Sequence, residues 1–600
     1  MASEQNTQKY SVNQHHVSTL LAWVQSGDIA IPEIQRPFVW KASKVRDLMD
    51  SLYKGFPVGY VITWQNPNVR LKDGTLSQGK RILIDGQQRV TALTAAMLGE
   101  HVVDSEYRRV RIRIAFHPVE ERFEVANQAI LKDAAWLSDI AVLFTGQKTL
   151  FAAVSEYVAA NPEVDQETVF ARLNRLLEVR HKQVGVIDLA ADLDIETVTT
   201  IFIRINSQGV VLGQADFAMS KIAASEAYGG AELRKAIDYF CHLARTPAFF
   251  EQIEQRDTAF TASAFWPKMK WLRDAKDDLY DPSYTDMLRV AFTSEFGRGR
   301  LADLVALLSG RNFETRTYEA EIAEDTFSRL RRGVETFMNE QHFQRFLMIV
   351  RSAGFVRPSM IRSKNALNVA YIVYLRLKKM GVLSADLERY VRRWLVMSLL
   401  TGRYSGAAET AIELDARTLT EEFPQHLARI EQATLSDAFW SFGLPQALDA
   451  SSANSVGFSV FVASQVRDGV KGFLSRDITV ADLVTHHADI HHLYPSDYLK
   501  KKGFSKAESN QVGNYVLMQT ELNIKVGNRA PGEYMSAVRA QCLGETPSLG
   551  GLEDLGALRQ NLHDHALPSE LLEAELPYSE FLEERRRLIA KRLRAYYVSL

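Results

Sequence analysis

Two adjacent histidines in the C-terminal part of the chain are the residues best suited to chemistry. They lie in the segment Asp489-Ile-His-His-Leu-Tyr-Pro495, and Asn514 and Asn523 follow. Histidine titrates near neutral pH and can remove a proton from water, as phosphodiester hydrolysis requires. The same reaction needs a divalent cation beside the phosphate, and a neutral imidazole with an asparagine carbonyl can hold one. The set therefore favours metal-dependent cleavage of a phosphodiester.

The residues around these side chains resemble the ββα-metal finger of HNH nucleases. The resemblance implies that the histidines end a first short strand, that residues 515–518 form a second, and that Asn523 opens a helix. The resemblance implies that His492 is the general base and that Asn514 steadies it. It implies His491 and Asn523 as ligands of Mg²⁺ or Mn²⁺.

The histidine segment has further interpretations. Asp489 lies on the same strand face as His491, so it is an alternative metal ligand. Residues 486–492 are rich enough in ligands for a structural zinc site, and plain polar packing is a third alternative. However, no cysteine lies nearby, and a zinc site would leave Asn514 and Asn523 without a role. The nuclease interpretation is therefore preferred.

A second polar cluster, Asp85-Gly-Gln-Gln-Arg89, lies between an apolar strand at 82–84 and an apolar helix at 90–98. Free N–H groups and the helix dipole attract an anion such as phosphate to this junction. Gly86 permits close backbone approach and Arg89 supplies paired donors, while Asp85 is suited to holding a metal ion or orienting a water. The alternative is a polar turn in which Arg89 pairs with a surface carboxylate.

Two further motifs flank this cluster in the sequence. Gln35-Arg36 precedes a proline and an aromatic pair, and residues 202–209 place Asn206 in a turn. Together, over about residues 15–225, the three motifs resemble the N-terminal domain of the GmrSD family, which is related to the ParB/sulfiredoxin-like fold. The resemblance implies binding and hydrolysis of a nucleoside triphosphate, with Asp85 as a catalytic residue. The residues implied in this site are Gln35, Arg36, Asp85, Gly86, Gln87, Gln88, Arg89 and Asn206.

Hydrophobic periodicity predicts the elements around these motifs. Apolar residues from Val45 to Tyr53 recur at helical spacing after Ser43, a plausible N-cap. Residues 60–64 and 184–189 are predicted strands, and residues 220–440 are almost wholly helical. Residues 443–457 have the composition of a loop and mark a candidate domain boundary.

Several arginines are candidate DNA contacts. Residues 109–114 alternate strictly, which predicts one half-buried strand with Arg109, Arg111 and Arg113 on one face. These side chains either contact DNA phosphates or form a solvated strand face. Arg529 is a further candidate in the C-terminal region, and residues 583–594 form a basic helix that either lies against DNA or is an ordinary solvated helix end.

Composition limits the class of protein. The 600 residues suggest several domains, 46% are apolar, and the formal net charge of -2 requires any DNA-binding surface to be local. Two cysteines, Cys241 and Cys542, provide no disulfide framework. The polar first residues and the short apolar runs predict a cytoplasmic protein without a membrane partner.

These inferences combine into an α+β multidomain chain: a ParB/sulfiredoxin-like sensor domain at 1–225, a helical domain at 226–450, and a mainly helical domain with an HNH finger at 451–600. The predicted function is a nucleotide-regulated DNA endonuclease that restricts modified phage DNA. Two alternatives are a nucleotide-binding regulator whose finger only grips DNA or a partner, and a nuclease toxin that acts on RNA. A homo-oligomer is compatible with all three.

Overall fold

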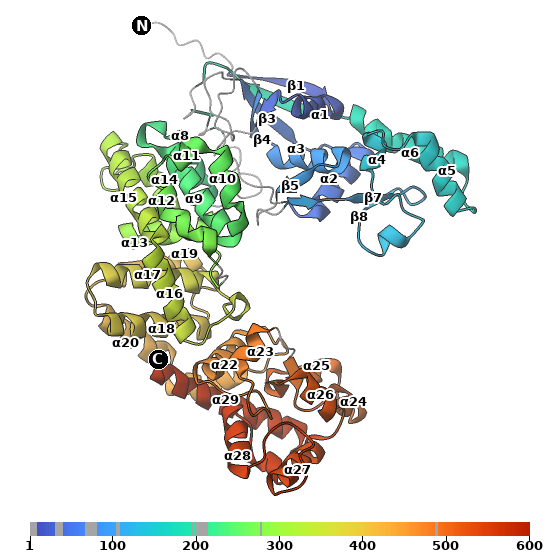
Figure 1. Ribbon diagram of the computed structural model, residues 1–600. Helices are drawn as coiled ribbons and strands as arrows, with labels where there is room; N and C mark the ends of the chain where they lie inside the picture. The colour runs from blue at the N-terminus through green and yellow to red at the C-terminus, as the bar shows by residue number, and fades with distance from the viewer. Residues whose placement is uncertain are drawn as a thin grey trace. The chain divides into compact units, whose positions relative to one another are not determined.

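The computed structural model describes residues 9–30, 40–65, 81–103, 109–193, 197–198, 201, 214–275, 279–486 and 490–600. The chain divides into two compact units (Figure 1). Unit 1 comprises Met1–Lys235 and Glu251–Ala262, and unit 2 comprises Ala236–Phe250 and Ser263–Leu600. A mixed α+β chain is confirmed. The division into three domains stays a prediction, as do the ParB-like and HNH folds.

A five-stranded mixed sheet organises unit 1. Its order is β1 (Tyr10–His16), β9 (Gln183–Leu189), β3 (Tyr60–Gln65), β4 (Arg81–Asp85) and β2 (Ile29–Ala30). Strand β3 runs parallel to β9 and antiparallel to β4, so β4 ends beside the beginning of β3. The three strands predicted around residues 60–64, 82–84 and 184–189 are confirmed.

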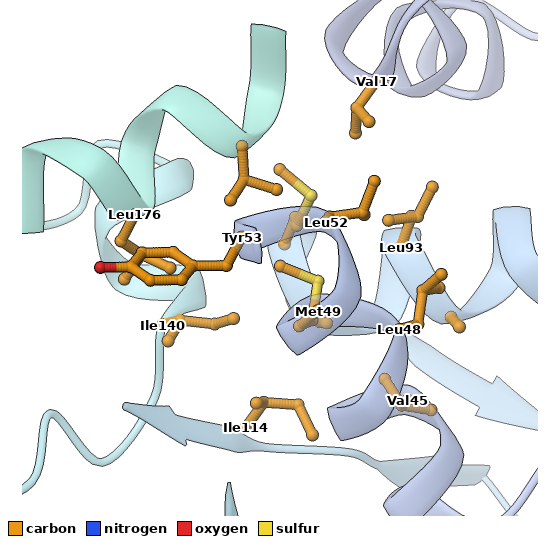
Figure 2. Packing of buried hydrophobic residues seen from close by; sticks show 14 of the residues in the cluster. Val17, Val45, Leu48, Met49, Leu52, Tyr53, Leu93, Ile114, Ile140 and Leu176 are labelled. Carbon is orange, nitrogen blue, oxygen red and sulfur yellow. The ribbon is translucent and has the colours of Figure 1, made fainter. Parts of the chain in front are cut away.

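Helices pack against this sheet through apolar faces. Helix α2 (Ala42–Lys54) buries Val45, Leu48, Met49, Leu52 and Tyr53, as its periodicity predicts. It begins after Lys41 rather than at a Ser43 cap, because Lys41 is the last residue with extended backbone. Figure 2 shows this face among Val17, Leu93, Ile114, Ile140 and Leu176. The other helices of this part are α1 (Val17–Gln25), α3 (Gln87–Leu93), η1 (Thr94–Leu98), α4 (Ala141–Phe144), α5 (Leu150–Ala160) and α6 (Gln166–Leu177).

The prediction of one continuous strand at 109–114 is wrong. Strand β6 (Arg109–Arg111) pairs with β5 (His101–Val103), and β7 (Ile114–His117) pairs with β8 (Arg122–Val125). The break follows from Arg111, which turns inward to an ion pair with Asp139 at 2.8 Å. Its guanidinium also donates to the carbonyl oxygens of Ala95 and Ile112, so the Ile112 carbonyl is satisfied without a strand partner.

Unit 2 is helical, and the prediction of helices from 220 to 440 is confirmed. At its centre, α15 (Ala320–Met338) crosses α13 (Tyr284–Phe296) closely, since a Cβ on Gly333 would lie 2.6 Å from the Ala291 oxygen. Within unit 2, α18 (Ser384–Leu400) also packs against α22 (Val456–Arg467). The remaining helices of unit 2 before residue 440 are α12 (Trp266–Met269), α14 (Leu301–Leu308), α16 (Glu340–Ser352), α17 (Lys364–Lys379), α19 (Ala408–Thr418) and α20 (Phe423–Thr434). Helices α8 (Gln214–Ala224) and α11 (Thr258–Thr261) belong to unit 1, and α9 (Gly230–Arg245) and α10 (Phe250–Arg256) each have residues in both units.

The candidate boundary at 443–457 is only partly a loop. Helix α21 (Leu444–Ala447) begins with Pro445 in its first turn, a position that suits proline. Helix α22 then begins at Val456, and Ser455 caps it by accepting from the Phe458 N–H. The connection between the two helices is therefore confined to residues 448–455.

The basic C-terminal helix packs into unit 2 along one face rather than forming a solvated helix end, and its contact with DNA phosphates stays a prediction. Helix α29 (Tyr578–Ser599) buries Phe581, Arg585 and Ile589 completely. Others of its arginines form ion pairs within unit 2: Arg586 with Asp449, Arg592 with Asp468, and Arg594 with Asp437. Its charges thus tie neighbouring helices together, because their partners are carboxylates of the same unit. Other helices here are α23 (Val480–Thr485), α24 (Ser496–Lys501), α25 (Lys506–Ser509), α26 (Thr520–Val526), α27 (Pro531–Cys542) and α28 (Leu555–Asp564).

Neither Cys241 nor Cys542 forms a disulfide. Within the described ranges, no helix combines the length and apolarity needed to span a bilayer.

Candidate functional site

A small ββα arrangement carries the histidine pair in unit 2. Strand β10 (Ile490–His492) pairs antiparallel with β11 (Tyr515–Leu517), so that His491 lies opposite Val516 and His492 opposite Tyr515. Helix α26 follows β11 after two residues. The predicted strands are therefore present. However, Asn523 is the fourth residue of α26 rather than its first, because the chain leaves extended backbone at Gln519.

His492 is half-buried at the end of β10. Its Nε2 lies 2.9 Å from the side-chain oxygen of Asn510, and its ring meets the ring of Tyr515 edge-on. Burial lowers the pKa of His492, and the hydrogen bond to Asn510 partly opposes this shift. Burial therefore favours the neutral imidazole, which is the state that a proton acceptor requires.

Asn514 is fully buried and holds backbone rather than the histidine ring. Its Oδ1 accepts from the Tyr494 N–H at 2.7 Å, and its Nδ2 donates to the oxygens of Tyr494 at 3.0 Å and Ser509 at 3.1 Å. It thereby joins the chain just after His492 to the residue that precedes Asn510. Any steadying of His492 by Asn514 passes through these two segments.

Arg585 of α29 supports the backbone on both sides of Asn514. It is completely buried and donates to the oxygens of Gly513 at 2.8 Å and Tyr515 at 2.7 Å. Burial lowers its pKa to about 9, so it remains a cation at neutral pH. Sequence reasoning missed this role, although Arg585 lies three residues after Leu582 and four before Ile589, on the apolar stripe of the helix.

The two described metal-ligand candidates lie on different elements. His491 is buried on β10, and Asn523 is half-buried on α26. Asp489 lies outside the described residues. Among those that are described, no group of three or more His, Cys, Asp and Glu side chains could hold a metal ion. A donor set of one imidazole and one amide oxygen suits Mg²⁺ or Mn²⁺ that keeps several waters.

Arg529 has a local structural role. Its guanidinium donates to the oxygens of Val526, at 3.0 Å, and Lys525, and so caps the C-terminal end of α26. These bonds engage part of its donor capacity, and a contact of Arg529 with DNA stays a prediction. Arg111 is likewise engaged within the fold, by Asp139 and two carbonyl oxygens, and the side chain of Arg109 lies outside the described residues. Arg113 is exposed.

A group of lysines between the two strands of the finger was not predicted. Lys500, Lys501, Lys502 and Lys506, the lysine patch, are all exposed. Neighbouring carboxylates already have hydrogen-bond partners: Asp497 accepts from Asn528, Glu508 accepts from the Ser505 N–H, and Glu575 accepts from Tyr498. In the part of the chain that the structure describes, no salt bridge involves a lysine of the patch. The run of three lysines at 500–502 was a signal available in the sequence.

The Asp85–Arg89 cluster adopts the predicted strand-to-helix junction in unit 1. Asp85 ends β4, Gly86 has φ +88°, and α3 begins at Gln87. Arg89 lies against Asp85 at 3.3 Å and donates to the Tyr60 oxygen, while burial lowers its pKa. The carboxylate partner of Arg89 therefore belongs to the motif itself.

Other members of the predicted nucleotide site are only partly described. Gln87 and Gln88 are buried, and the Gln88 side-chain oxygen accepts from the Trp40 N–H at 3.3 Å. This bond draws the chain after the Gln35-Arg36 motif towards the cluster. Gln35, Arg36 and Asn206 lie outside the described residues.

We predict that Gly86→Ala destabilises unit 1 by about 1–3 kcal/mol. Alanine would have to keep the left-handed backbone conformation of Gly86, and its Cβ would lie 3.1 Å from the Val61 Cα. Gly146→Ala is the control, since Gly146 has φ +74° but no atom within 4 Å of the added Cβ. The thermal unfolding of the two variants tests this. Equal losses of stability would show that the close approach to Val61 has no effect.

Comparison with known proteins identifies the N-terminal part. Residues 17–223 match the family model of the GmrSD restriction endonuclease, N-terminal domain. Residues 17–223 are thus similar to the N-terminal domain of GmrSD restriction endonucleases, and the match covers this part of the chain alone. The resemblance inferred from the three motifs is confirmed for this domain.

A curated protein is also similar over almost the whole chain. It is an uncharacterised protein of Methanocaldococcus jannaschii, 19% identical over 647 residues, with 96% of this chain and 98% of that protein covered. The alignment therefore extends well beyond residues 17–223.

Proposed function

We propose that the protein is a restriction endonuclease and that it cleaves DNA with an HNH-type finger formed by β10, β11 and α26. The observation that carries the proposal is the state of His492: a half-buried, neutral imidazole at the end of β10, with one ring nitrogen bonded to Asn510. The pairing of β10 with β11 and the position of α26 supply the order of elements that the finger requires.

His492 acts as the general base in this mechanism. It takes a proton from a water molecule whose oxygen attacks phosphorus, the bond from phosphorus to the leaving oxygen breaks, and that oxygen takes a proton from solvent. His491 and Asn523 would hold Mg²⁺ or Mn²⁺, with Asp489 as the alternative ligand. The ion would stabilise the negative charge that develops on the phosphate. Asn514 and Arg585 hold the strands that carry these side chains.

The N-terminal domain regulates this activity in our proposal. The junction at Asp85–Arg89 binds a nucleoside triphosphate, with Gln35, Arg36 and Asn206 as further contacts and Asp85 in its hydrolysis. The support is the backbone at Gly86 and the N-terminus of α3, where N–H groups can bind phosphate. The domain senses modified phage DNA and controls cutting. Two alternatives are a regulator without nuclease activity and an RNA-directed nuclease toxin. The cleavage assay described next separates both from the proposal.

The test is incubation of the purified protein with supercoiled plasmid and Mg²⁺ or Mn²⁺. Each nucleoside triphosphate is added or omitted, modified and unmodified DNA are compared, and an RNA of equal length is included. Metal-dependent nicking or cutting of DNA supports the proposal. Cutting of RNA alone would favour the toxin, whereas nucleotide hydrolysis without any cutting would favour the regulator.

The lysine patch, in the segment that connects β10 to β11, supports a polyanionic substrate for the finger. We predict that alanine at all four lysines weakens DNA binding. The negative slope of log K against log salt should become less steep, by about 0.9 for each lost phosphate contact. The single-turnover rate at saturating DNA should stay unchanged. The control is alanine at Lys378 and Lys379, exposed lysines at the end of α17. An unchanged salt slope in the patch variant would exclude the patch from the DNA surface.

A further inference from the structure

We infer that Asn510 is the positioning residue of His492: it selects which ring nitrogen carries the proton and fixes the plane of the ring. This inference rests on the proposed nuclease function. Sequence analysis did not single out Asn510, and it lies 18 residues after His492.

The direction of the hydrogen bond sets the tautomer. The Asn510 Oδ1 can only accept, so the His492 Nε2, 2.9 Å away, must donate. In a neutral imidazole the other nitrogen, Nδ1, then has a free lone pair and is the proton acceptor. Without Asn510, both tautomers become populated, and the ring can rotate about its side-chain bonds.

Asn510 is itself held firmly. It ends α25, whose first turn is closed by a capping box between Ser505 and Glu508, and its N–H donates to the Lys506 oxygen at 3.0 Å. The Tyr578 hydroxyl of α29 donates to the Glu508 oxygen at 2.9 Å.

The preceding residue is fixed as well. Ser509 is buried, its oxygen accepts from Asn514, and its hydroxyl donates to the Ser505 oxygen at 3.0 Å. Asn514 also binds the backbone of Tyr494, accepting from its N–H and donating to its carbonyl oxygen. This one buried side chain therefore sets the spacing between the segment after His492 and the segment before Asn510. The amide of Asn510 is thus presented to the ring by a supported loop.

The experiment compares Asn510→Leu, which is similar in size but has no acceptor, with Asn510→Asp, which keeps one. In the full-length protein we expect Asn510→Leu to lower the single-turnover cleavage rate about 10–100-fold. The DNA dissociation constant and the half-saturating Mn²⁺ concentration should stay as in the wild type. Asn510→Asp should restore most of the rate. Asn528→Leu, which removes only an exposed bond to Asp497, is the matched control and should cut normally.

A second measurement does not depend on cleavage. The ¹⁵N signals of His492, assigned with His492→Gln, should show protonated Nε2 in the wild type and a mixture of tautomers in Asn510→Leu. An unchanged spectrum in Asn510→Leu would overturn the inference. It would also be overturned if Asn510→Leu cut at the wild-type rate while His492→Ala did not. Parallel loss of rate, DNA affinity and thermal stability without rescue by aspartate would overturn it as well. If the wild type never cuts but the spectra differ as expected, only the proposed nuclease function fails.

Discussion

His492→Ala is expected to lower the rate of DNA cleavage about 10²–10⁴-fold, the usual contribution of a general base. The variant loses the imidazole that Asn510 holds at the end of β10, so water must react without this base. Fold and DNA binding should be retained, because the ring is only half-buried. Nucleotide hydrolysis in unit 1 should remain nearly intact. Single-turnover cleavage and nucleotide turnover, measured on the same preparation, test both statements.

The control for this variant is His563→Ala. His563 is an exposed histidine in α28 of the same unit, 78% exposed at its side chain. It should cut at the wild-type rate. If His492→Ala also cut at that rate, His492 would have no place in the mechanism, and the proposal would have to move to another base.

Arg585→Ala should have the largest effect on stability, roughly 3–5 kcal/mol. It removes a completely buried side chain and leaves the oxygens of Gly513 and Tyr515 without their donors. Because these residues flank Asn514 and Tyr515 begins β11, cleavage should fall together with stability. Arg585→Lys should lose less, since a single ammonium can replace only part of the forked contact.

Arg587→Ala is the matched control on the same helix. Its side chain is 60% exposed and pairs with Glu583 and Glu584, so its removal should change stability by only about 0–1 kcal/mol. Calorimetry of the full-length variants, with cleavage measured in parallel, makes the comparison. Arg585→Ala that unfolds at the wild-type temperature would contradict the supporting role of this arginine.

Elements with a strong local pattern were predictable from the sequence. The apolar stripe of α2, the strands β3, β4 and β9, and the helical region before residue 440 all agree with the structure. The junction at Asp85–Arg89 also agrees, because glycine between a buried strand and an apolar helix has few local alternatives. The predicted strand at 109–114 was wrong because a side chain found a partner distant in sequence. Arg111 has the alternation of a strand residue, but its ion pair with Asp139 ends the strand.

The candidate site shows the same division. Three ordered motifs were enough to identify the GmrSD N-terminal domain, and the strands at 490–492 and 515–517 agree with the predicted finger. The role of His492 as a base stays a prediction. The sequence could not show that Asn510 contacts His492, that Asn514 binds backbone, or that Arg585 supports β11.

The sequence by itself determined the local elements, the types of reactive side chain and the family of the N-terminal domain, because periodicity and motifs are set by residues close together along the chain. Only the tertiary structure decided which side chains support the finger and which arginines are used internally. The contact of His492 with Asn510 joins residues 18 positions apart, and that of Arg585 with Gly513 joins residues 72 positions apart. Burial selects such contacts, since a polar group removed from water needs a partner wherever the fold brings one.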